Sequence, residues 1–279
     1  MEPESLPAVA VLLACFNRRD STLRCLSTLN QQEVNARVRI VVLDDGSTDG
    51  TGDAIRDQFP AVDVVTSTGN LYWAASMARA EAVAMEARPD LLIWMNDDVV
   101  LDDGALQRLL AASYENPDSI VGGAMRDPDT AVVTYTGYRR VDRHPLHLRA
   151  VQPDNGVATE VDALNGNFVA VPASVQERVG KIDGAFAHAY ADFDYSFRTS
   201  QAGFKVLLAP GTFGTCPRNP TTGARSRREA LRRLRAPKGS PLRSQVRFLR
   251  RHGGWEWPIY LAGPYVKALM KPAAGTESI

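Results

Sequence analysis

Three polar residues, Asn96, Asp97 and Asp98, directly follow the apolar run LLIWM at residues 91–95. A carboxylate beside a hydrophobic core costs several kcal/mol unless its charge is compensated. Hard divalent cations prefer oxygen ligands, and proteins often hold them with one or two carboxylates together with substrate phosphates. The sequence therefore predicts a cation site at the end of this run. The alternative is a polar strand end that caps the next helix.

Other polar residues follow the three apolar segments that precede this run. They are Asn17, Asp44, Asp45 and Asn70. The apolar segments alternate with helical patterns, which indicates parallel crossover units in a sheet that is covered on both faces. In such sheets ligands bind at the carboxyl ends of the strands. We therefore expect these side chains and residues 96–98 to converge on one site.

The elements that must position these residues follow from the spacing of apolar side chains. Strands are expected at 8–14, in the segment that ends at Leu43, at 61–68 and at 90–100. Helices are expected at 20–32, from about Asp49, at 73–87 and at 102–115. Asp20 or Ser21 is expected to cap the first helix. Asp102 and Asp103 are expected to cap the last one.

The chain after residue 115 has a different pattern. Residues 116–162 are rich in turn formers, and their short strand-like pieces, such as 131–141, are expected to be antiparallel and partly exposed. A further core segment at 162–172 precedes a helix at 173–180. No internal repeat divides the chain.

The composition is that of an ordinary globular protein, with 44% hydrophobic and 23% charged residues and no net charge. No stretch approaches the roughly 18 to 20 unbroken apolar residues of a membrane-spanning helix. The acidic start MEPESLPAVA is unlike the basic start of a secretion signal. The three cysteines, Cys15, Cys25 and Cys216, lack the spacing of a metal site and suit a reducing compartment. We therefore expect a cytoplasmic protein.

Basic residues gather near the end of the chain: of the 32 basic and 32 acidic residues, twelve basic and one acidic lie within 218–251. The aromatic residues Trp255, Trp257, Tyr260 and Tyr265 follow. Basic and aromatic residues together suit an anionic membrane, so a peripheral contact through 218–251 at the inner face of the cell membrane is expected. The alternative is a solvated basic face with an aromatic contact in a homodimer. No recognised nucleic-acid module accompanies the charge, so no nucleic-acid partner is expected.

Five segments carry most of the residues named above. They are VAVLLACFNRRD, IVVLDDGSTDGT, LLIWMNDDVVL, LNGNFVAVP and HAYADFDYSFRTSQAGF. In their order and spacing they resemble the family 2 glycosyltransferases of the GT-A fold, over about Val9 to Pro210. Within that family they are most similar to bacterial enzymes that add rhamnose or similar sugars to surface polysaccharides.

The resemblance implies an α/β protein of the GT-A architecture, in which a mixed central sheet is flanked by helices. It implies a glycosyltransferase domain at 1–215, with a nucleotide-binding half at about 8–115 and an acceptor half at about 116–215. Residues 216–279 are expected to form a helical extension that is rich in basic and aromatic residues.

The resemblance assigns donor-binding roles to residues after the first two strands. Ala14, Phe16 and Arg18 stand where the family holds the nucleotide base and its phosphates. The ring of Phe16 can stack on a base, and Arg18 can offset the charge of a diphosphate. Asp45 matches the position that accepts a hydrogen bond from the base. The alternative for Asp45 is a turn or N-cap residue within DDGSTDG.

The next two polar segments complete the donor site. Asn70 and Trp73 lie where the family closes a loop over the nucleotide, although Trp73 fits a core position equally well. The run Asn96-Asp97-Asp98 matches the Asp-X-Asp motif, which holds Mg²⁺ or Mn²⁺ against the donor diphosphate. Asp98 takes the metal-binding position beside Asp97 of the donor site. Asn96 replaces the first carboxylate of the motif; its amide can bind a ribose hydroxyl but compensates less of the cation's charge.

The expected catalytic residue comes from the fifth segment. An inverting transfer needs a carboxylate that takes a proton from the acceptor hydroxyl as this hydroxyl attacks the anomeric carbon. Asp192 matches the catalytic base of the family, although Ala191 stands where the family more often has Glu. Asp194 and Arg198 match the acidic and basic positions that follow. On a helix these two residues are an i, i+4 pair, so a structural ion pair is the alternative.

Three further residues belong to the acceptor side of the expected site. Asn165 and Gly166 lie in LNGNFVAVP, and His188 precedes Asp192 by four residues. His188 can contact a metal or a phosphate, although a lone histidine is more often a satisfied polar residue. The resulting prediction is an inverting enzyme that moves a sugar from a nucleoside-diphosphate sugar to a saccharide or glycolipid acceptor. The alternatives are a sugar nucleotidyltransferase and a non-catalytic nucleotide-sugar binding protein.

Overall fold

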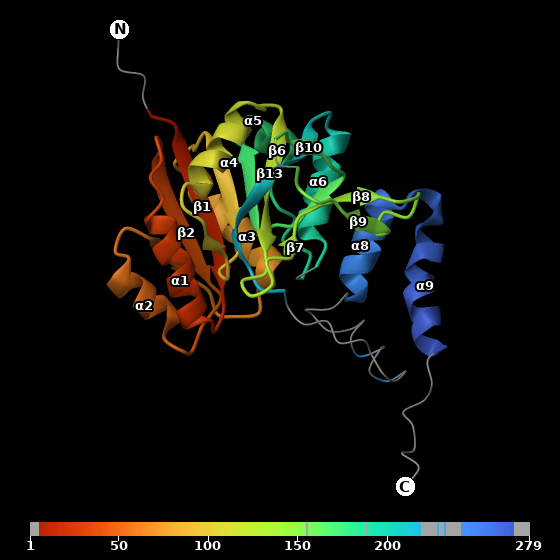
Figure 1. The fold of residues 1–279 in the computed structure, drawn as a ribbon. Helices are drawn as coiled ribbons and strands as arrows, with labels where there is room; N and C mark the ends of the chain where they lie inside the picture. Colours follow the sequence, from red (N-terminus) through yellow and green to blue (C-terminus); the bar gives the residue numbers. More distant parts are fainter. Residues whose placement is uncertain are drawn as a thin grey trace.

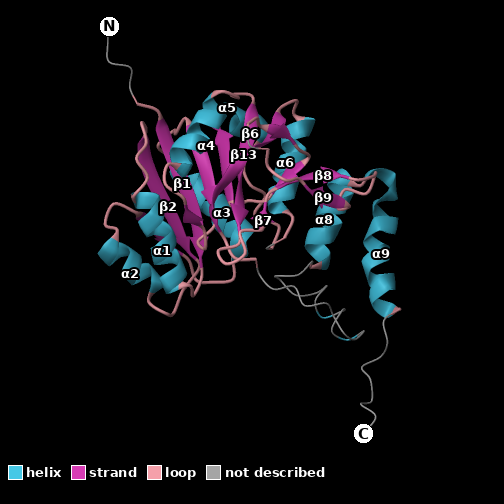
Figure 2. Cartoon of the chain, in the orientation of Figure 1, coloured by secondary structure: helices cyan, strands magenta, loops and turns pink. Residues whose placement is uncertain are grey.

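The computed structural model describes residues 6–154, 156–187, 189–218, 228, 232 and 241–270. Its strands are β1 (Ala8–Cys15), β2 (Arg37–Asp44), β3 (Asp63–Thr66), β4 (Leu91–Met95), β5 (Val100–Leu101), β6 (Ser119–Arg126), β7 (Val133–Tyr135), β8 (Gly137–Arg140), β9 (Leu148–Ala150), β10 (Thr159–Glu160), β11 (Ala163–Leu164), β12 (Phe168–Pro172) and β13 (Lys205–Thr215). Its helices are α1 (Arg19–Asn30), α2 (Thr51–Gln58), α3 (Tyr72–Met85), α4 (Ala105–Tyr114), α5 (Ala173–Val179), α6 (Ala191–Gln201), α8 (Leu242–His252), the 3-10 helix η1 (Gly254–Glu256) and α9 (Trp257–Leu269). In Figure 2 the strands form the centre of the molecule and the helices lie around them.

The main sheet is mixed, as the resemblance implies. Its strand order is β10-β13-β6-β12-β4-β1-β2-β3, with β5 on β13 and β7 on β6. β1 is parallel to β2 and β4, and β2 is parallel to β3, which confirms the four parallel strands expected from the first third of the sequence. β12 is antiparallel to both of its neighbours, β4 and β6. The four parallel strands end at one edge of the sheet, and this is the edge where the polar residues follow them.

The apolar sequence of the central strands follows from burial on both faces. Every residue of β4 is buried, and only two residues of β1 are partly exposed. One face packs against α3 and α6 through residues such as Leu12, Met77 and Tyr195. The other face packs against α1 and α4 through residues such as Leu26 and Leu106. Because helices cover both faces, these strands have no polar side.

Strand β6 lies in the stretch that the sequence predicts to be loop-rich, and for residues 119–126 that prediction is wrong. The strand is buried for all but its last residue and pairs with β12 and β13. Gly122 and Gly123 explain the error, because they resemble turn residues in the sequence but here make room for neighbouring side chains. A Cβ atom on Gly122 would lie 2.6 Å from Leu164, and one on Gly123 would lie 2.8 Å from Phe213. The following strands β7, β8 and β9 are short and antiparallel, as expected.

The expected helices form, but their expected caps do not. α1 begins at Arg19 and α4 at Ala105, and their N-cap residues, Arg18 and Gly104, make no side-chain cap hydrogen bond. The side chains of Asp49 and Gln32 instead accept the N–H groups of Arg19 and Leu106. The carboxylate of Asp102 instead accepts hydrogen bonds from both Nη atoms of Arg126, at 2.6 and 2.8 Å. The carboxylate of Asp102, which the local sequence predicts to be a helix cap, is thus paired with Arg126 at the end of β6. The capping expected of Asp20, Ser21, Asp102 and Asp103 is therefore wrong.

A small second sheet and the C-terminal helices lie beside the main sheet. The small sheet has the order β11-β8-β9. α8 packs on α6 through the rings of Phe197 and Phe248, whose centroids are 5.7 Å apart, and α9 packs on α8. Figure 1 shows α8 and α9 near β8 and β9, at the margin of the molecule. Among the described helices, none is long and apolar enough to cross a membrane.

Candidate active site

The loops after β1 and β2 are joined by hydrogen bonds of Asn17. Its Oδ1 accepts a hydrogen bond from the Thr48 N–H at 2.7 Å, and its own N–H donates to Ser47 Oγ at 2.9 Å. Asn17 has a φ of 49°, in the left-handed region that asparagine tolerates better than most residues. Asp44 accepts a hydrogen bond from the Ser47 N–H at 2.9 Å. The ends of the first two strands therefore meet, as a site at this edge of the sheet requires.

One guanidinium bridges the two carboxylates that follow β4. Arg18 Nη1 donates to Asp97 Oδ1 and Arg18 Nη2 donates to Asp98 Oδ2, each at 2.8 Å. Both carboxylates are buried, with side-chain exposures of 6% and 8%, whereas 42% of the Arg18 side chain is exposed. An arginine from the end of β1 therefore offsets part of the charge that the sequence placed beside the core.

Burial dominates the electrostatics of this pair of acids. It raises the pKa of Asp97 to about 6, against the opposing effect of Arg18 and with a smaller contribution from the charge of Asp98. The Thr22 hydroxyl donates to Asp97 Oδ2 at 3.4 Å, and the Cys216 thiol donates to Asp98 Oδ1 at 3.2 Å. Among the described residues, the pair is thus bound by weak donors and by one guanidinium, that of Arg18.

Asp45 holds the loop that follows β3. Its carboxylate accepts hydrogen bonds from Ser67 Oγ at 2.6 Å, from the Leu71 N–H at 2.9 Å and from the Tyr72 N–H at 3.0 Å. The two N–H groups lie at the start of α3, where unpaired backbone donors favour a negative charge. Asn70 lies in the same loop, is exposed and has a φ of 68°. Asp45 therefore fixes this loop rather than a turn within its own segment.

Trp73 connects the donor side of the site to the segment between β11 and β12. Its indole N–H donates to Asn96 Oδ1 at 2.9 Å. Its ring packs against Gly166, where a Cβ atom would come within 2.7 Å of the indole. It also meets Trp94 edge-on, with 6.5 Å between the ring centroids. Trp73 thus belongs both to the packed interior and to the wall of the site.

Asp192 lies in the first turn of α6 and faces the same segment. Its Oδ2 accepts the Gly166 N–H at 3.1 Å and its Oδ1 accepts the Phe193 N–H at 2.9 Å. The Asn165 side chain also binds this carboxylate, and its Oδ1 accepts the Tyr138 hydroxyl at 2.9 Å. Burial raises the pKa of Asp192, and the hydrogen bonds oppose this rise. A carboxylate with a raised pKa is a stronger proton acceptor than an ordinary one.

The segment between β11 and β12 brings the two acids of the expected mechanism into one region. Gly166 donates to Asp192, as described above, and the neighbouring Asn167 donates to Cys216 Sγ at 3.4 Å. Cys216 in turn contacts Asp98. Asp98 and Asp192 therefore lie on either side of one short segment rather than on opposite sides of the molecule.

Asp194 and Arg198 form the structural ion pair that was the alternative prediction. Arg198 Nε donates to Asp194 Oδ2 at 2.9 Å, and the Asp194 side chain is fully buried. Arg251 Nη1 and His252 Nε2 lie 2.6 and 2.9 Å from its other oxygen. Burial alone would raise the pKa of Asp194, but these partners outweigh it and lower the pKa below its ordinary value. Two positions separate Asp194 from Asp192 on the helix, so the two carboxylates point to opposite sides of α6.

The remaining predicted residues lie at the rim of the site or outside the description. Phe16 directly follows β1 and is 51% exposed, so its ring is accessible to a ligand. Ala14 is half-buried within β1. His188 lies outside the described residues. The roles of these three residues stay predictions.

Four residues that support the site were not among the predicted ones. They are Thr22, Ser67, Asn167 and Cys216. Ser67 follows a strand and Asn167 precedes one, as the predicted residues do, so the same pattern could have identified them. Thr22 lies inside α1, and Cys216 lies 118 residues from its partner Asp98. No local signal in the sequence marks either of these two.

The carboxylates of Asp97 and Asp98 are the groups that a divalent cation would use. Among the described residues, no group of three or more His, Cys, Asp or Glu side chains is placed to hold a metal ion. Mg²⁺ in particular is usually held by one or two carboxylates that share the ion with substrate phosphates. Two buried carboxylates beside the partly exposed Arg18 fit this shared arrangement rather than a closed protein cage.

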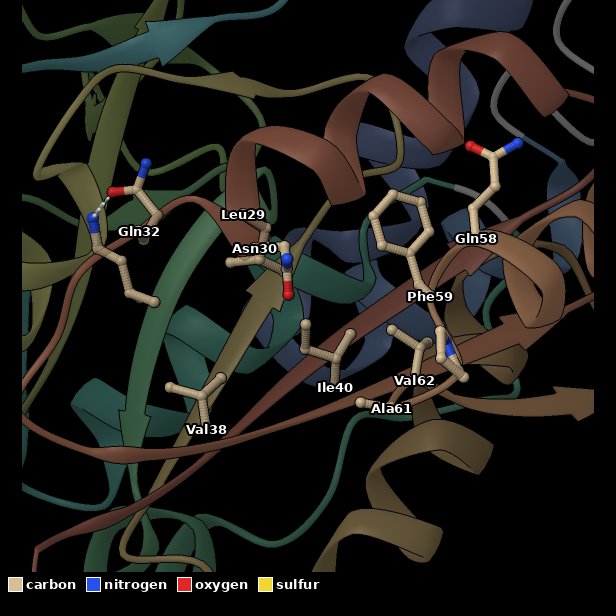
Figure 3. A pocket seen from close by; sticks show the side chains of 11 residues that line it. Leu29, Asn30, Gln32, Val38, Ile40, Gln58, Phe59, Ala61 and Val62 are labelled. Atoms are coloured by element: carbon tan, nitrogen blue, oxygen red, sulfur yellow. Dashed lines mark hydrogen bonds between the residues drawn. The ribbon is translucent and has the colours of Figure 1, made fainter.

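A separate pocket of about 360 Å³ lies away from these residues. The apolar residues that line it include Leu29, Val38, Ile40, Phe59 and Val62, and Figure 3 shows their side chains. Val38 is at the start of β2, whereas Asp44 is at its end, about 20 Å away at roughly 3.3 Å per residue. None of the predicted site residues lines this pocket. It is therefore not the donor site that the sequence predicts.

Comparison with known proteins identifies the family. The model of the family described as "Glycosyl transferase family 2" matches residues 10–169. This is more than half of the 279 residues of the chain. The match includes the ends of β1, β2 and β4, and therefore the residues that surround Arg18, Asp45 and Asp98.

Two curated relatives cover more of the chain. The "N-acetylglucosaminyl-diphospho-decaprenol L-rhamnosyltransferase" of Mycobacterium tuberculosis is 27% identical over 231 residues, which are 74% of this chain and 73% of the relative. The "Poly-beta-1,6-N-acetyl-D-glucosamine synthase" of Staphylococcus epidermidis is 22% identical over 226 residues, which are 76% of this chain and 53% of the relative. The chain thus spans about half the length of the staphylococcal protein.

Solved structures share the fold. GalNAc-T7 with UDP, GalNAc and Mn²⁺ has a TM-score of 0.67 at 14% identity, over 99% of this chain and 53% of that one. The mannosyltransferase PcManGT of Pyrobaculum calidifontis with GDP-Man and Mn²⁺ has a TM-score of 0.59 at 18% identity, over 96% and 73%. At these identities the likeness shows the fold alone, and that fold is the expected GT-A architecture. With the family match, these findings exclude the nucleotidyltransferase and binding-protein alternatives: the chain belongs to glycosyl transferase family 2 and is a glycosyltransferase.

Proposed function

We propose that this enzyme transfers a sugar with inversion at the anomeric carbon, with Asp192 as the general base and a divalent cation held at Asp98. The observation that carries the proposal is the convergence of both acids on the segment between β11 and β12. Gly166 binds Asp192 on one side of this segment, and Asn167 reaches Asp98 through Cys216 on the other. A sugar bound there would have its departing diphosphate near one acid and its acceptor near the other.

The donor belongs at the edge formed by the ends of β1, β2 and β4. Phe16 offers an exposed ring to the base, and Arg18 carries the positive charge that a diphosphate requires. Asp45 acts by fixing the loop before α3, and Trp73 acts by orienting Asn96. The GalNAc-T7 structure is with UDP and the PcManGT structure is with GDP-Man, which supports a nucleoside-diphosphate sugar as the donor.

Asp97 and Asp98 are the residues that would hold Mg²⁺ or Mn²⁺. When bound, the ion would neutralise charge on the departing nucleoside diphosphate. Arg18 pairs with both carboxylates, and its partly exposed side chain is long enough to turn toward a phosphate. Both structures named above contain Mn²⁺, which supports the assignment.

The transfer itself needs one proton acceptor. The acceptor hydroxyl oxygen bonds to the anomeric carbon, while the bond from that carbon to the diphosphate breaks and its electron pair leaves with the diphosphate. The hydroxyl proton passes to the carboxylate of Asp192. Trp73 and Gly166 close one side of this carboxylate, and the Gly166 N–H fixes its orientation.

The acceptor that we propose is a saccharide, either free or linked to a lipid. The name of the mycobacterial relative includes a decaprenol diphosphate, which supports the lipid-linked case. The peripheral membrane contact expected of 218–251 and a cytoplasmic location belong to this proposal. The buried cysteines, which form no disulfide, agree with a reducing compartment. The homodimer expected as the alternative stays a prediction.

Replacement of the base tests the proposal. Asp192→Asn should lower kcat by about 10²- to 10⁴-fold, the usual contribution of a general base, and should leave donor affinity unchanged. Asp129→Asn, which changes an exposed acid outside the site, is the matched control. Equal turnover in Asp192→Asn and the control would contradict the role of Asp192. A product that retains the anomeric configuration, as read by NMR, would contradict inversion.

The pH dependence of kcat/KM provides a second test. Because burial raises the pKa of Asp192, the rate should fall with decreasing pH at a value above the ordinary aspartate pKa of about 3.9. The sign follows from the role, since the base must be deprotonated to accept a proton. The residual rate of Asp192→Asn should lack this acidic limb. A limb that persists unchanged in the variant would belong to another group.

A further inference from the structure

The C-terminal helix α9 has an apolar face that the described chain does not cover. Trp255, just before the helix, and Met270, just after it, are each 81% exposed, and Ile259 is 65% exposed. Val266 and Leu269 are also more than half exposed. Their spacings of four, seven, three and one residues place them on one side of the helix. These five residues are called the α9 face below.

The opposite side of α9 is anchored. Ala268 is buried, and Trp257, Tyr260 and Leu261 pack against the main core. The Tyr260 hydroxyl donates to Glu256 at 2.6 Å. Figure 1 shows α9 at the margin of the molecule, beyond α8. The helix therefore holds its apolar face outward from a fixed base.

The charged residues of the C-terminal helices are almost all basic. Within 241–270, Glu256 is the only acidic residue, and its carboxylate already accepts the Tyr260 hydroxyl. Arg247 and Arg251 pair with buried or partly buried acids of the body, so they are not available to a ligand. The cations of this range that form no ion pair with another described residue are Arg243, Arg250 and Lys267. The C-terminal helices thus combine an exposed apolar face with unpaired basic residues. The acid of the neighbouring loop that acts on Tyr260, Asp142, lies 2.9 Å from His147 Nδ1.

A second copy of the chain is a poor occupant of this surface. A two-fold interface brings the same patch of both copies together. Lys267 lies on the same helix as this face, so a two-fold contact would bring the Lys267 of each copy toward that of the other, and like charges across an interface oppose association. An anionic lipid bilayer complements both properties, because its headgroups attract the cations and its acyl boundary accepts the apolar side chains.

We propose that the α9 face lies on an anionic lipid bilayer, with its five apolar side chains in the interface and the three cations at the headgroups. The 13 residues of α9 span about 20 Å, which is shorter than the roughly 30 Å hydrocarbon core, so the helix lies in the interface plane. Trp255 begins this face, and tryptophan favours the headgroup level. This assignment extends the membrane contact expected of 218–251 to α9, because Arg243 and Arg250 lie in that range.

The contact would fix the orientation of the catalytic helix, and this part of the inference rests on the proposed function. Arg251 and His252 at the end of α8 bind Asp194 in α6, two residues after Asp192. Ser244 Oγ, near the start of α8, accepts the Ala187 N–H from the segment before α6, at 3.2 Å. α9 packs on α8. A protein held through the α9 face therefore presents Asp192 to the bilayer in one orientation, as a lipid-linked acceptor requires.

Flotation of the full chain with lipid vesicles tests the inference. Wild-type protein should float with vesicles of phosphatidylcholine and phosphatidylglycerol. Ile259→Ser with Val266→Ser should reduce this partition at least about tenfold, because two interfacial aliphatic side chains are lost. Val132→Ser with Val157→Ser is the matched control, since these valines are 64% and 66% exposed outside the C-terminal helices and the β8–β9 loop. It should float like wild type, and unchanged thermal unfolding of both variants would show that they fold.

The other arms of the experiment separate the alternatives. Arg243→Ala with Lys267→Ala should remove the preference for phosphatidylglycerol over pure phosphatidylcholine. Asp192→Asn should float like wild type, so loss of transfer in that variant does not affect the membrane result. Full flotation of the Ile259→Ser, Val266→Ser variant would overturn the inference, and so would a lipid-free dimer that this variant converts to a monomer while vesicle binding persists.

Discussion

Two groups of buried carboxylates in this protein are neutralised in different ways. At the edge of the parallel strands, Asp97 and Asp98 share the single guanidinium of Arg18, whose side chain is 42% exposed. In α6, Asp194 alone receives two guanidinium groups and an imidazole, all within 2.9 Å. Among the described residues, the first group has two acids for one cation, whereas Asp194 has three basic partners, of which it shares Arg251 with Asp183.

The difference distinguishes the proposed binding cluster of Asp97 and Asp98 from the structural cluster around Asp194. Burial raises the pKa of Asp97 to about 6 because Arg18 compensates it only in part. At Asp194 the opposite holds, since its partners outweigh burial and lower the pKa. The first cluster can accept a further positive charge, as the proposed metal–diphosphate site requires. The second cluster is complete, and it ties α8 to the helix that carries Asp192.

The largest effect on stability is expected at Asp194, the acid with three basic partners. Asp194→Asn should lower the free energy of unfolding by about 3–5 kcal/mol, because buried cationic partners lose their counter-charge. Asp98→Asn should cause no loss, since it removes one of two acids that share one cation. Urea denaturation followed by circular dichroism measures both. Equal destabilisation by the two substitutions would mean that the clusters do not differ in the way described.

The pH dependence of stability should also differ between Asp97 and Asp194. Between the ordinary aspartate pKa of about 3.9 and the value of about 6 in the folded state, folded Asp97 binds more protons than unfolded Asp97. The free energy of unfolding therefore falls as the pH rises through this window, by about 2 kcal/mol relative to Asp97→Asn. Asp194, with its lowered pKa, stabilises above its ordinary value and loses this contribution only as the pH falls below it. Parallel stability curves for wild type and Asp97→Asn would contradict the partial compensation.

Arg18 provides a smaller and more specific test. Arg18→Ala should raise the affinity for Mn²⁺ in the absence of nucleotide by about tenfold, or 1.4 kcal/mol, because both carboxylates lose their counter-ion. Arg19→Ala is the matched control, as its neighbouring side chain makes no described contact with either acid. Calorimetric titration with MnCl₂ measures the change. Weaker Mn²⁺ binding in Arg18→Ala than in the control would show that Arg18 does not compete with the ion.

The smallest effect on stability is expected at Arg247, which lies beside the structural cluster around Asp194. Arg247 pairs with Asp183 at 2.6 Å, and 42% of its side chain is exposed. Asp183 is only 14% exposed but keeps its second partner Arg251, so Arg247→Ala should lower the free energy of unfolding by about 1 kcal/mol or less. The same urea titration compares it with Asp194→Asn. A loss of stability as large as that of Asp194→Asn would show that Asp183, rather than Asp194, is the main acid of this structural cluster.

The sequence revealed the parallel half of the fold and its site because the signals there are local. Asp45 and Asp98 follow β2 and β4 within three residues, so the sheet edge on which they meet could be predicted. The partners of these acids could not. Arg18 lies about 80 residues from Asp98, and Cys216 lies 118 residues from it. Only the packing of distant elements brings these groups together.

The acceptor half depends more on such distant contacts. The sequence pattern predicts a loop for β6, because its two glycines are typical of turns. In the structure these glycines make room for Leu164 of β11 and Phe213 of β13. The i, i+4 spacing indicated the pair of Asp194 and Arg198, but the further partner Arg251 lies 57 residues away. The sequence therefore identified the acids of this half without showing which of them is neutralised.

The most direct test of a cation at Asp98 that grips the donor diphosphate is calorimetric binding of nucleoside diphosphates, UDP and GDP among them, with and without Mn²⁺. In wild type, Mn²⁺ should strengthen binding of the preferred nucleotide by at least about tenfold. Asp98→Asn should lose this gain, and Asp192→Asn should keep it, because the base does not touch the diphosphate. A gain from Mn²⁺ that is the same in Asp98→Asn as in wild type would contradict the account.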